Sequence, residues 1–172
     1  GERYGEDVRI IHDYLAGKGI SMIIWGDRLL ESISGKGLQT RKAPDGFTYQ
    51  VAGGMTPEQV NRLIPKDVLI FNWAWSTFDT GDGTSPTGWK QDQVEGFEAE
   101  FDKMGFQQVF GNLHPYAENW KARMKRSSII GGAPSVWFAT NEIGIGKDQL
   151  SDFLGGANML WRDEALYGQD LS

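Results

Sequence analysis

Four short apolar runs, each ending in aromatic and polar residues, constrain the fold of this chain more than any other feature. They predict strands over Ser21–Trp25, Val68–Trp73 and Phe106–Gly111, and a fourth strand centred on Val136. A short run that is apolar throughout is typical of a parallel strand covered on both faces. Ligands of parallel α/β folds bind at the carboxyl ends of the strands. The runs therefore predict a parallel sheet whose strand ends form one binding floor.

Helical patterns lie between these runs, so strands and helices alternate along the chain. The clearest pattern spans Asp92 to Met104, where apolar residues repeat at helical spacing and Gly105 ends the repeat. Thr56 and Gln59 predict a capping box at the start of another helix, with Pro57 at its first position. The remaining predicted segments are helices over residues 6–16, after residue 120 and over residues 147–161, and long loops over residues 35–54 and 77–86. No linker composition divides the chain, so residues 1–172 are predicted to form a single domain.

Composition argues against several classes of protein. The formal net charge of -6 and the isoelectric point near 4.9 argue against a nucleic-acid partner, which requires clustered Lys and Arg. The one basic cluster is interpreted as a helix end whose cations suit the helix dipole; it contains Lys121, Arg123, Lys125 and Arg126. The chain has no Cys, no apolar run long enough for a membrane span and no signal-like first residues. We therefore expect no cofactor, metal or membrane partner, and the compartment stays open.

Seven Trp are the unusual feature of the composition. An indole N–H needs a hydrogen-bond partner when it is buried, so several Trp at strand ends indicate a binding surface rather than simple core filling. Trp25, Trp73 and Trp137 all follow this placement, whereas Trp75 could instead face the surrounding helices. Flat indole rings suit sugar rings. The strand ends therefore predict a carbohydrate-binding floor.

Short motifs at the four strand ends give a more specific expectation. They are Ile24–Asp27, Leu69–Trp73, Gly105–Val109 with Pro115–Glu118, and Gly131–Trp137 followed by Glu142. Together they resemble strands five to eight of family 20 glycoside hydrolases, the β-N-acetylhexosaminidases. The resemblance implies the C-terminal half of a TIM (β/α)8 barrel, and a full-length glycosidase that acts on N-acetylhexosamine-type glycans. It also implies a secreted or periplasmic protein.

The resemblance implies roles for particular residues. The three strand-end Trp would wall the sugar pocket, Tyr116 would hold the acetamido group, and Glu118 is the acid expected two residues further on. Glu142 is the acid that follows Trp137, at a looser spacing. Asp27 could bind a sugar hydroxyl or cap a helix. The predicted substrate-binding set is Trp25, Asp27, Trp73, Asn112, Tyr116, Glu118, Trp137 and Glu142.

No catalytic residue is assigned within the chain. In the family, a neighbouring Asp-Glu pair at the end of strand four supplies the general acid and orients the acetamido group, which acts as nucleophile. The resemblance in this chain starts after that point. Glycoside hydrolysis needs two groups flanking the bond, although the substrate can supply one of them. We therefore expect this chain to supply the aromatic pocket and to be inactive by itself.

Two other functions stay open on the sequence. The same aromatic floor could belong to a non-catalytic carbohydrate-binding module. Alternatively, the four units could form an open flavodoxin-like sheet with an interaction role. A half barrel differs from both because it exposes two unpaired strand edges and an apolar face, so it predicts self-association of the chain on its own.

Overall fold

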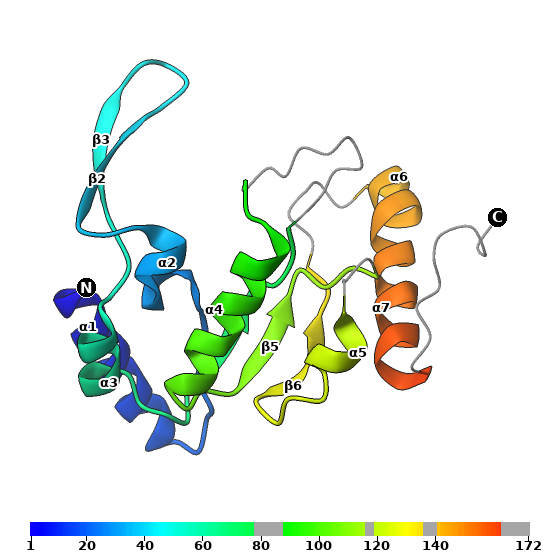
Figure 1. Cartoon of the computed structure of the whole chain (residues 1–172), viewed down its shortest axis with the longest axis horizontal. Helices are drawn as coiled ribbons and strands as arrows, with labels where there is room; N and C mark the ends of the chain where they lie inside the picture. Colours follow the sequence, from blue (N-terminus) through cyan, green and yellow to red (C-terminus); the bar gives the residue numbers. More distant parts are fainter. Residues whose placement is uncertain (78–87, 116–118, 136–140, 163–172) are drawn as a thin grey trace.

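The computed structural model describes residues 1–77, 88–115, 119–135 and 141–162 (Figure 1). Four strands form one parallel sheet: β1 (Ile23–Trp25), β4 (Leu69–Asn72), β5 (Gln108–Gly111) and β6 (Ile129–Ala133). Their order across the sheet is the order along the chain, β1-β4-β5-β6. The predicted α/β fold with four parallel strands is therefore confirmed.

The fourth strand lies earlier in the chain than predicted. β6 ends at Ala133, and the next residue, Pro134, has no N–H to donate to the ladder. Gly132 suits this strand because a Cβ at that position would lie 2.6 Å from the side chain of Leu113. The expected strand centre, Val136, lies outside the described residues.

Helices alternate with the strands. The capping box of Thr56 and Gln59 is present, and it starts α3 as the sequence predicts. The helical segments are α1 (Glu2–Ala16), η1 (Asp27–Leu29), α2 (Glu31–Ser34), α3 (Pro57–Leu63), α4 (Gln91–Lys103), α5 (Trp120–Arg123), α6 (Glu142–Gly144), a π-helical turn η2 (Ile145–Gln149) and α7 (Leu150–Arg162). The apolar stripe of α4 is core, because Val94, Phe97 and Phe101 are buried.

The prediction of a loop over residues 35–54 is wrong in one respect. It contains an antiparallel hairpin of β2 (Leu38–Lys42) and β3 (Thr48–Ala52). Figure 1 shows this hairpin standing away from the body of the molecule. The polar composition of the segment concealed the strands, since neither face of the hairpin packs on a core.

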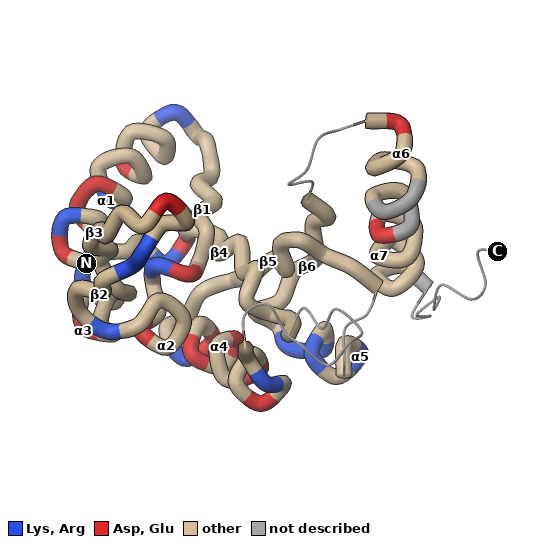
Figure 2. Tube along the Cα trace, turned by 90° about the horizontal axis from the view of Figure 1, so that it is seen from above, with Lys and Arg blue, Asp and Glu red and all other residues tan. Residues whose placement is uncertain are grey.

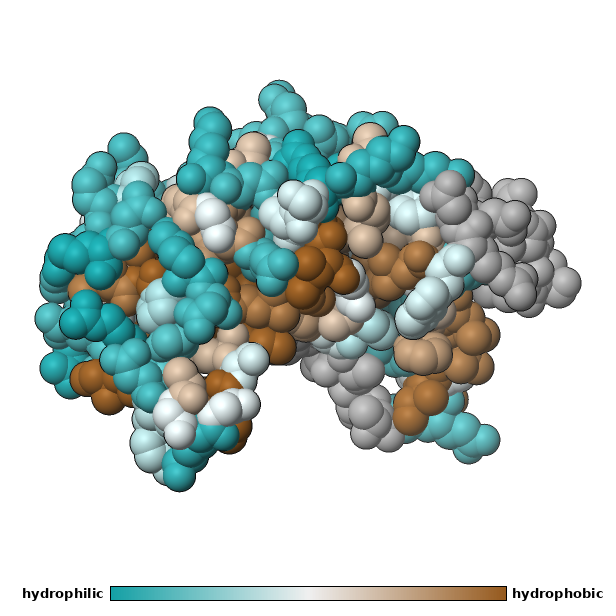
Figure 3. All heavy atoms as spheres, turned by 90° about the horizontal axis from the view of Figure 1, so that it is seen from below, coloured by the Kyte–Doolittle hydropathy of each residue, from teal (hydrophilic) through white to brown (hydrophobic). Residues whose placement is uncertain are grey.

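Helices cover one face of the four-strand sheet. Figures 1 and 2 show α4 and α5 against this face, with α1 and α7 at the two ends of the sheet. Side chains on the covered face are buried, including Ile70 and Phe110. On the other face, Phe71 and Val109 are only partly buried. Figure 3 shows the molecule hollowed on one side, with apolar side chains near the margin of the hollow.

Exposed large apolar side chains gather at the two ends of the sheet. The β1 end, from α1 to β1, carries Tyr4, Ile10, Ile11, Tyr14, Ile20 and Ile23. The β6 end, from β6 to α7, carries Ile130, Ile143, Ile145, Leu150, Phe153, Leu154 and Trp161. The other exposed large apolar residues among the described ones lie on the hairpin: Leu38, Phe47 and Tyr49. The outer strands and their helices are therefore the apolar surface of the described chain.

We predict that the isolated chain self-associates through these ends. Ile23 is 56% exposed on the outer strand β1, so Ile23→Lys should shift the chain toward monomer in multi-angle light scattering. Leu38→Lys is the matched control, because Leu38 is 74% exposed on the hairpin. A wild-type chain that stays monomeric at high concentration would contradict the prediction.

Candidate functional site

The carboxyl ends of β1, β4 and β5 bring two aromatic rings together. Trp25 at the end of β1 pairs in register with Phe71 of β4, and the two rings meet edge to face with centroids 4.4 Å apart. Gly111 at the end of β5 makes room for both rings. A Cβ there would lie 2.7 Å from the Phe71 ring and 3.1 Å from the Trp25 ring. Three neighbouring strand ends therefore build one aromatic floor.

Phe71 is a member of this floor that sequence reasoning missed. It lies inside the apolar run of β4, where nothing distinguishes it from a core residue. Strand alternation was the available signal. Neighbouring Ile70 and Asn72 are buried on the helix-covered face, so Phe71 points to the opposite face.

Asn112 follows β5 directly and has a left-handed backbone with φ of 55°. Asn tolerates this conformation better than most residues, and such backbones are found frequently at functional sites. The backbone N–H of the next residue, Leu113, donates to the carbonyl of Ala133 in β6. The turn therefore holds the partly buried Asn112 beside the end of β5.

His114 and Ser76 form a polar pair at the ends of β5 and β4. The His114 Nε2 and the Ser76 Oγ are 3.1 Å apart, and the imidazole lies 4.7 Å from the ring of Trp75. Trp75 is fully buried and donates its indole N–H to the carbonyl of Gly111. Trp75 therefore packs on the helix-covered side of the sheet, stacked on Phe110, and stabilises the strand ends through its bond to Gly111. Of the two orientations that the sequence left open, this is the one that faces the helices. Burial lowers the pKa of His114 to about 4, so the imidazole is neutral near pH 7.

Trp73 belongs to a separate aromatic group. Its ring lies 5.2 Å from that of Trp89, which in turn packs edge to face on Phe97 of α4. This pair lies near the start of α4. Trp73 is partly buried there, at the end of β4 but not in a described ring contact with Trp25.

The two predicted acids that the structure describes lie apart. Asp27 opens η1 and is partly buried, 3.8 Å from Arg28. It does not cap η1, whose N-cap is Gly26. Burial of Tyr4 in α1 raises the pKa of its hydroxyl, and the nearby negative charge of Asp27 raises that pKa further. Glu142 is exposed in the first turn of α6, and no described contact joins it to the aromatic floor.

Three predicted site residues lie outside the described residues: Tyr116, Glu118 and Trp137. Most of the predicted long loop over residues 77–86 lies outside them as well. Within the described ranges, no group of three or more His, Asp or Glu is placed to hold a metal ion. The search for a helix long and apolar enough to cross a membrane, made over the same ranges, finds none.

A buried polar network beneath the floor fixes β4 and β5. Arg123 of α5 donates to the carboxylate of Glu98 in α4 and to the carbonyl of Trp75. The Gln108 amide of β5 donates to the Glu98 carbonyl at 3.1 Å and accepts from Asn72 of β4 at 3.0 Å. Two helices and two strands are therefore joined by groups that are nearly or fully buried.

The basic cluster is therefore more than a helix end. Arg123 is 2% exposed, and Arg126 lies 3.5 Å from Asp102 in α4. Burial raises the pKa of Glu98, which the neighbouring guanidinium opposes. The sequence did hold a signal for this pair, because Glu98 directly follows Phe97 within the apolar stripe of α4.

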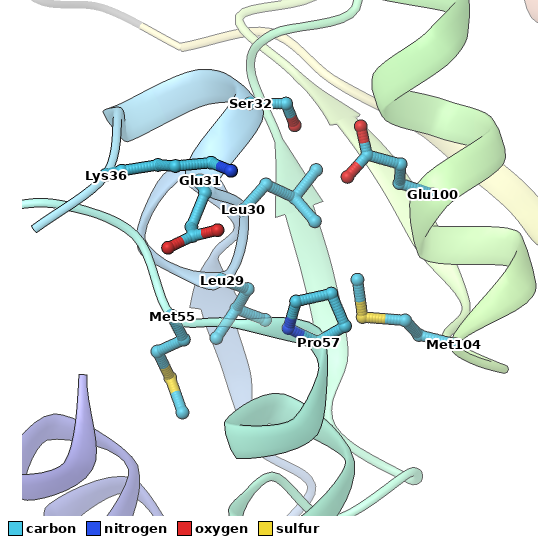
Figure 4. Close-up of a pocket in the computed structure, with 9 residues that line it drawn as sticks. All are labelled: Leu29, Leu30, Glu31, Ser32, Lys36, Met55, Pro57, Glu100 and Met104. Atoms are coloured by element: carbon cyan, nitrogen blue, oxygen red, sulfur yellow. The ribbon is translucent and has the colours of Figure 1, made fainter.

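A pocket of about 250 Å³ lies on the helical side of the molecule (Figure 4). Its lining is apolar at the base, with Glu31, Lys36 and Glu100 at the rim. The lining residues are Leu29, Leu30, Glu31, Ser32, Lys36, Met55, Pro57, Glu100 and Met104. None of them belongs to the aromatic floor, so this pocket is separate from the candidate site.

Comparisons with models of protein families, with curated proteins and with solved structures find no match to this chain. The candidate function therefore rests on the chemistry of the strand ends and on the way in which the sheet is covered.

We predict that removing the Arg123 charge destabilises the fold. Arg123→Met removes the guanidinium that binds the buried Glu98 carboxylate and leaves only the more distant Arg126, 3.8 Å away, which should cost about 3–5 kcal/mol in urea unfolding. The double variant Glu98→Leu/Arg123→Met removes both charges and should recover most of the loss. Equal losses of unfolding free energy in the single and double variants would show that the unpaired Glu98 charge is not the cause of the destabilisation.

His114 predicts a second, pH-dependent effect. The unfolded chain takes up a proton on this imidazole near pH 6.5, whereas the folded chain does so only near pH 4. The contribution of His114 to stability is therefore complete above about pH 6.5 and is lost as the pH falls toward 4. Urea unfolding at pH 7 and pH 5 should show this loss in the wild type and a smaller one in His114→Gln. Identical losses in both proteins would contradict the assignment.

Proposed function

We propose that this chain is the substrate-pocket half of a (β/α)8-barrel glycoside hydrolase that acts on N-acetylhexosamine-type glycans. The observation that carries the proposal is the pair of Trp25 and Phe71 over Gly111 at the carboxyl ends of parallel strands. Parallel α/β folds bind their ligands at this edge. Flat aromatic rings suit the apolar faces of sugar rings, while neighbouring amides and hydroxyls suit their hydroxyl and acetamido groups.

Neutral polar groups follow the end of β5 and support this choice of ligand. The Asn112 amide can both donate and accept hydrogen bonds, and so can the neutral His114 imidazole. These groups match a neutral sugar better than a phosphate, which would require clustered cations. Tyr116, Glu118, Trp137 and Glu142 are proposed to complete the pocket on the β5 and β6 side, as the family resemblance implies.

The strand order supports a half barrel over a flavodoxin-like sheet. A doubly wound sheet reverses its strand order at a switch point, which places helices on both faces. This sheet keeps the order β1-β4-β5-β6 without a reversal. Right-handed crossovers then place the connecting helices on one side, as in a barrel. The arrangement of α4 and α5 in Figure 2 agrees with this.

The apolar ends of the sheet support the same proposal. A half barrel would bury the outer strands β1 and β6, together with the outer faces of α1 and α7, against the other half. The segments at the two ends of the sheet, from α1 to β1 and from β6 to α7, carry thirteen of the sixteen exposed large apolar residues described. We propose that four preceding strand-helix units cover them and supply the acidic pair. Hydrolysis is then a property of the longer polypeptide, and sugar recognition is the part that this chain can show.

Sugar binding by the chain tests the proposal. We predict weak, saturable binding of N-acetylglucosamine in ligand-observed NMR, and loss of that binding in Trp25→Ala. Trp161→Ala is the matched control, because Trp161 is 81% exposed on α7 and should leave binding unchanged.

Two outcomes decide between the rival functions. Hydrolysis of an aryl N-acetylglucosaminide by an upstream-extended polypeptide would support the glycosidase. Sugar binding without hydrolysis in that polypeptide would favour a carbohydrate-binding module instead. Absence of sugar binding in both polypeptides would contradict the proposed site.

A further inference from the structure

We propose that the β2–β3 hairpin binds an acidic sugar unit, a uronic acid or a sulfated residue, on a glycan whose N-acetylhexosamine occupies the aromatic floor. This inference rests on the proposed function, and it adds the charge class of the substrate. It concerns the face of the hairpin that carries Arg41, Phe47 and Tyr49, which we name the arm face.

The hairpin is anchored at its base. The guanidinium of Arg28, just after β1, donates to the carbonyl of Ala52 at 2.5 Å. The Gln39 amide donates to the carbonyl of Ser34 at the end of α2 at 2.8 Å. At the tip, Gly46 has a φ of 89°, a left-handed conformation that favours glycine in a tight turn. The hairpin is therefore held at its base and closed by a tight turn at its tip, although neither of its faces packs on a core.

Two aromatic rings share the arm face. The rings of Phe47 and Tyr49 are within 10° of parallel with centroids 6.4 Å apart. Phe47 is 66% exposed and Tyr49 is 41% exposed, so both rings are open to solvent. Side chains two apart on a strand point to the same side. The two stacked rings thus form an exposed apolar platform on the arm face.

A cation lies on the same face as the platform. Arg41 is the register partner of Tyr49, and directly paired residues of antiparallel strands share a face. A guanidinium binds carboxylate or sulfate groups through two parallel hydrogen bonds. The two neighbouring cations lie elsewhere: Lys42, paired with Thr48, is on the opposite face of the hairpin, and Lys36 precedes β2 and lines the pocket between α2 and α4. The arm face therefore offers one guanidinium beside two aromatic rings, and this charge fits an acidic group on a ligand.

The position of the hairpin connects it to the floor. Figure 1 shows it rising on the side of the sheet toward which the β5 arrow points, which is the side of the strand ends. It also follows β1 and η1 in the chain, just after Trp25 and Asp27. A glycan that leaves the floor on the β1 side would meet the hairpin. A single-stranded nucleic acid also combines base stacking with positive charge, but one guanidinium on the arm face is too few for a phosphate backbone.

The test compares three probes on the whole chain by isothermal titration. They are N-acetylgalactosamine, neutral chitohexaose and a chondroitin sulfate hexasaccharide, in which N-acetylhexosamine alternates with uronic acid. We expect the acidic hexasaccharide to bind about tenfold or more tighter than either neutral probe, with an affinity that falls as salt is added. Arg41→Gln and Phe47→Ala/Tyr49→Ala should each remove this gain without changing the monosaccharide affinity. Leu38→Ala, on the opposite face of the hairpin, is the matched control.

The outcomes separate the hairpin from the floor. The wild-type chain could fail to bind the monosaccharide and still bind the acidic hexasaccharide tightly in a way that depends on Arg41. That result would contradict sugar binding at the aromatic floor and support the hairpin site. Equal affinities for the acidic and neutral hexasaccharides would overturn the hairpin. The hairpin site would also be contradicted if both hairpin variants kept the higher affinity for the acidic hexasaccharide. Tighter binding of oligo(dT) than of the acidic hexasaccharide would contradict it as well.

Discussion

The buried ion pair between Glu98 and Arg123 is the interaction on which the candidate site depends. It joins α4 to α5, and through Gln108 and Asn72 it reaches the strands β4 and β5 from the helical side. A buried charge pair is weak evidence for stability in itself, because desolvation offsets much of its attraction. Its value here is geometric. Polar groups with fixed partners hold the strand ends in one arrangement, and Gly111 between them then leaves room for Trp25 and Phe71.

The covering of the sheet is the second constraint. Helices occupy one face, the opposite face is hollowed, and the apolar surface is concentrated on the outer strands and their helices (Figures 2 and 3). Apolar side chains scattered singly over a surface need no explanation, but a grouping at both ends of one sheet does. The proposed half barrel would account for both this grouping and the consecutive strand order. The hairpin is the exception to the pattern, since its exposed rings lie away from the sheet and beside a cation.

The sequence predicted the repeating units well because their signals are local. Continuous apolar runs predicted β1, β4 and β5, the stripe of Val94, Phe97 and Phe101 predicted α4, and Thr56 with Gln59 predicted the start of α3. It missed features that arise from pairing across the chain. The hairpin strands lack an apolar face, Phe71 looked like core until its strand neighbours were placed, and the partner of Arg123 lies 25 residues earlier. Trp75 and Trp25 have the same type of side chain, and only strand alternation and packing separate the buried Trp75 from the floor.

The measurement that tests the central claim most directly is a crystal structure of the chain with N-acetylglucosamine bound. The account predicts the apolar face of the sugar ring against Trp25 and Phe71, with its polar groups toward Asn112. A sugar bound only in the pocket between α2 and α4, or on the hairpin without contact to the strand ends, would contradict it.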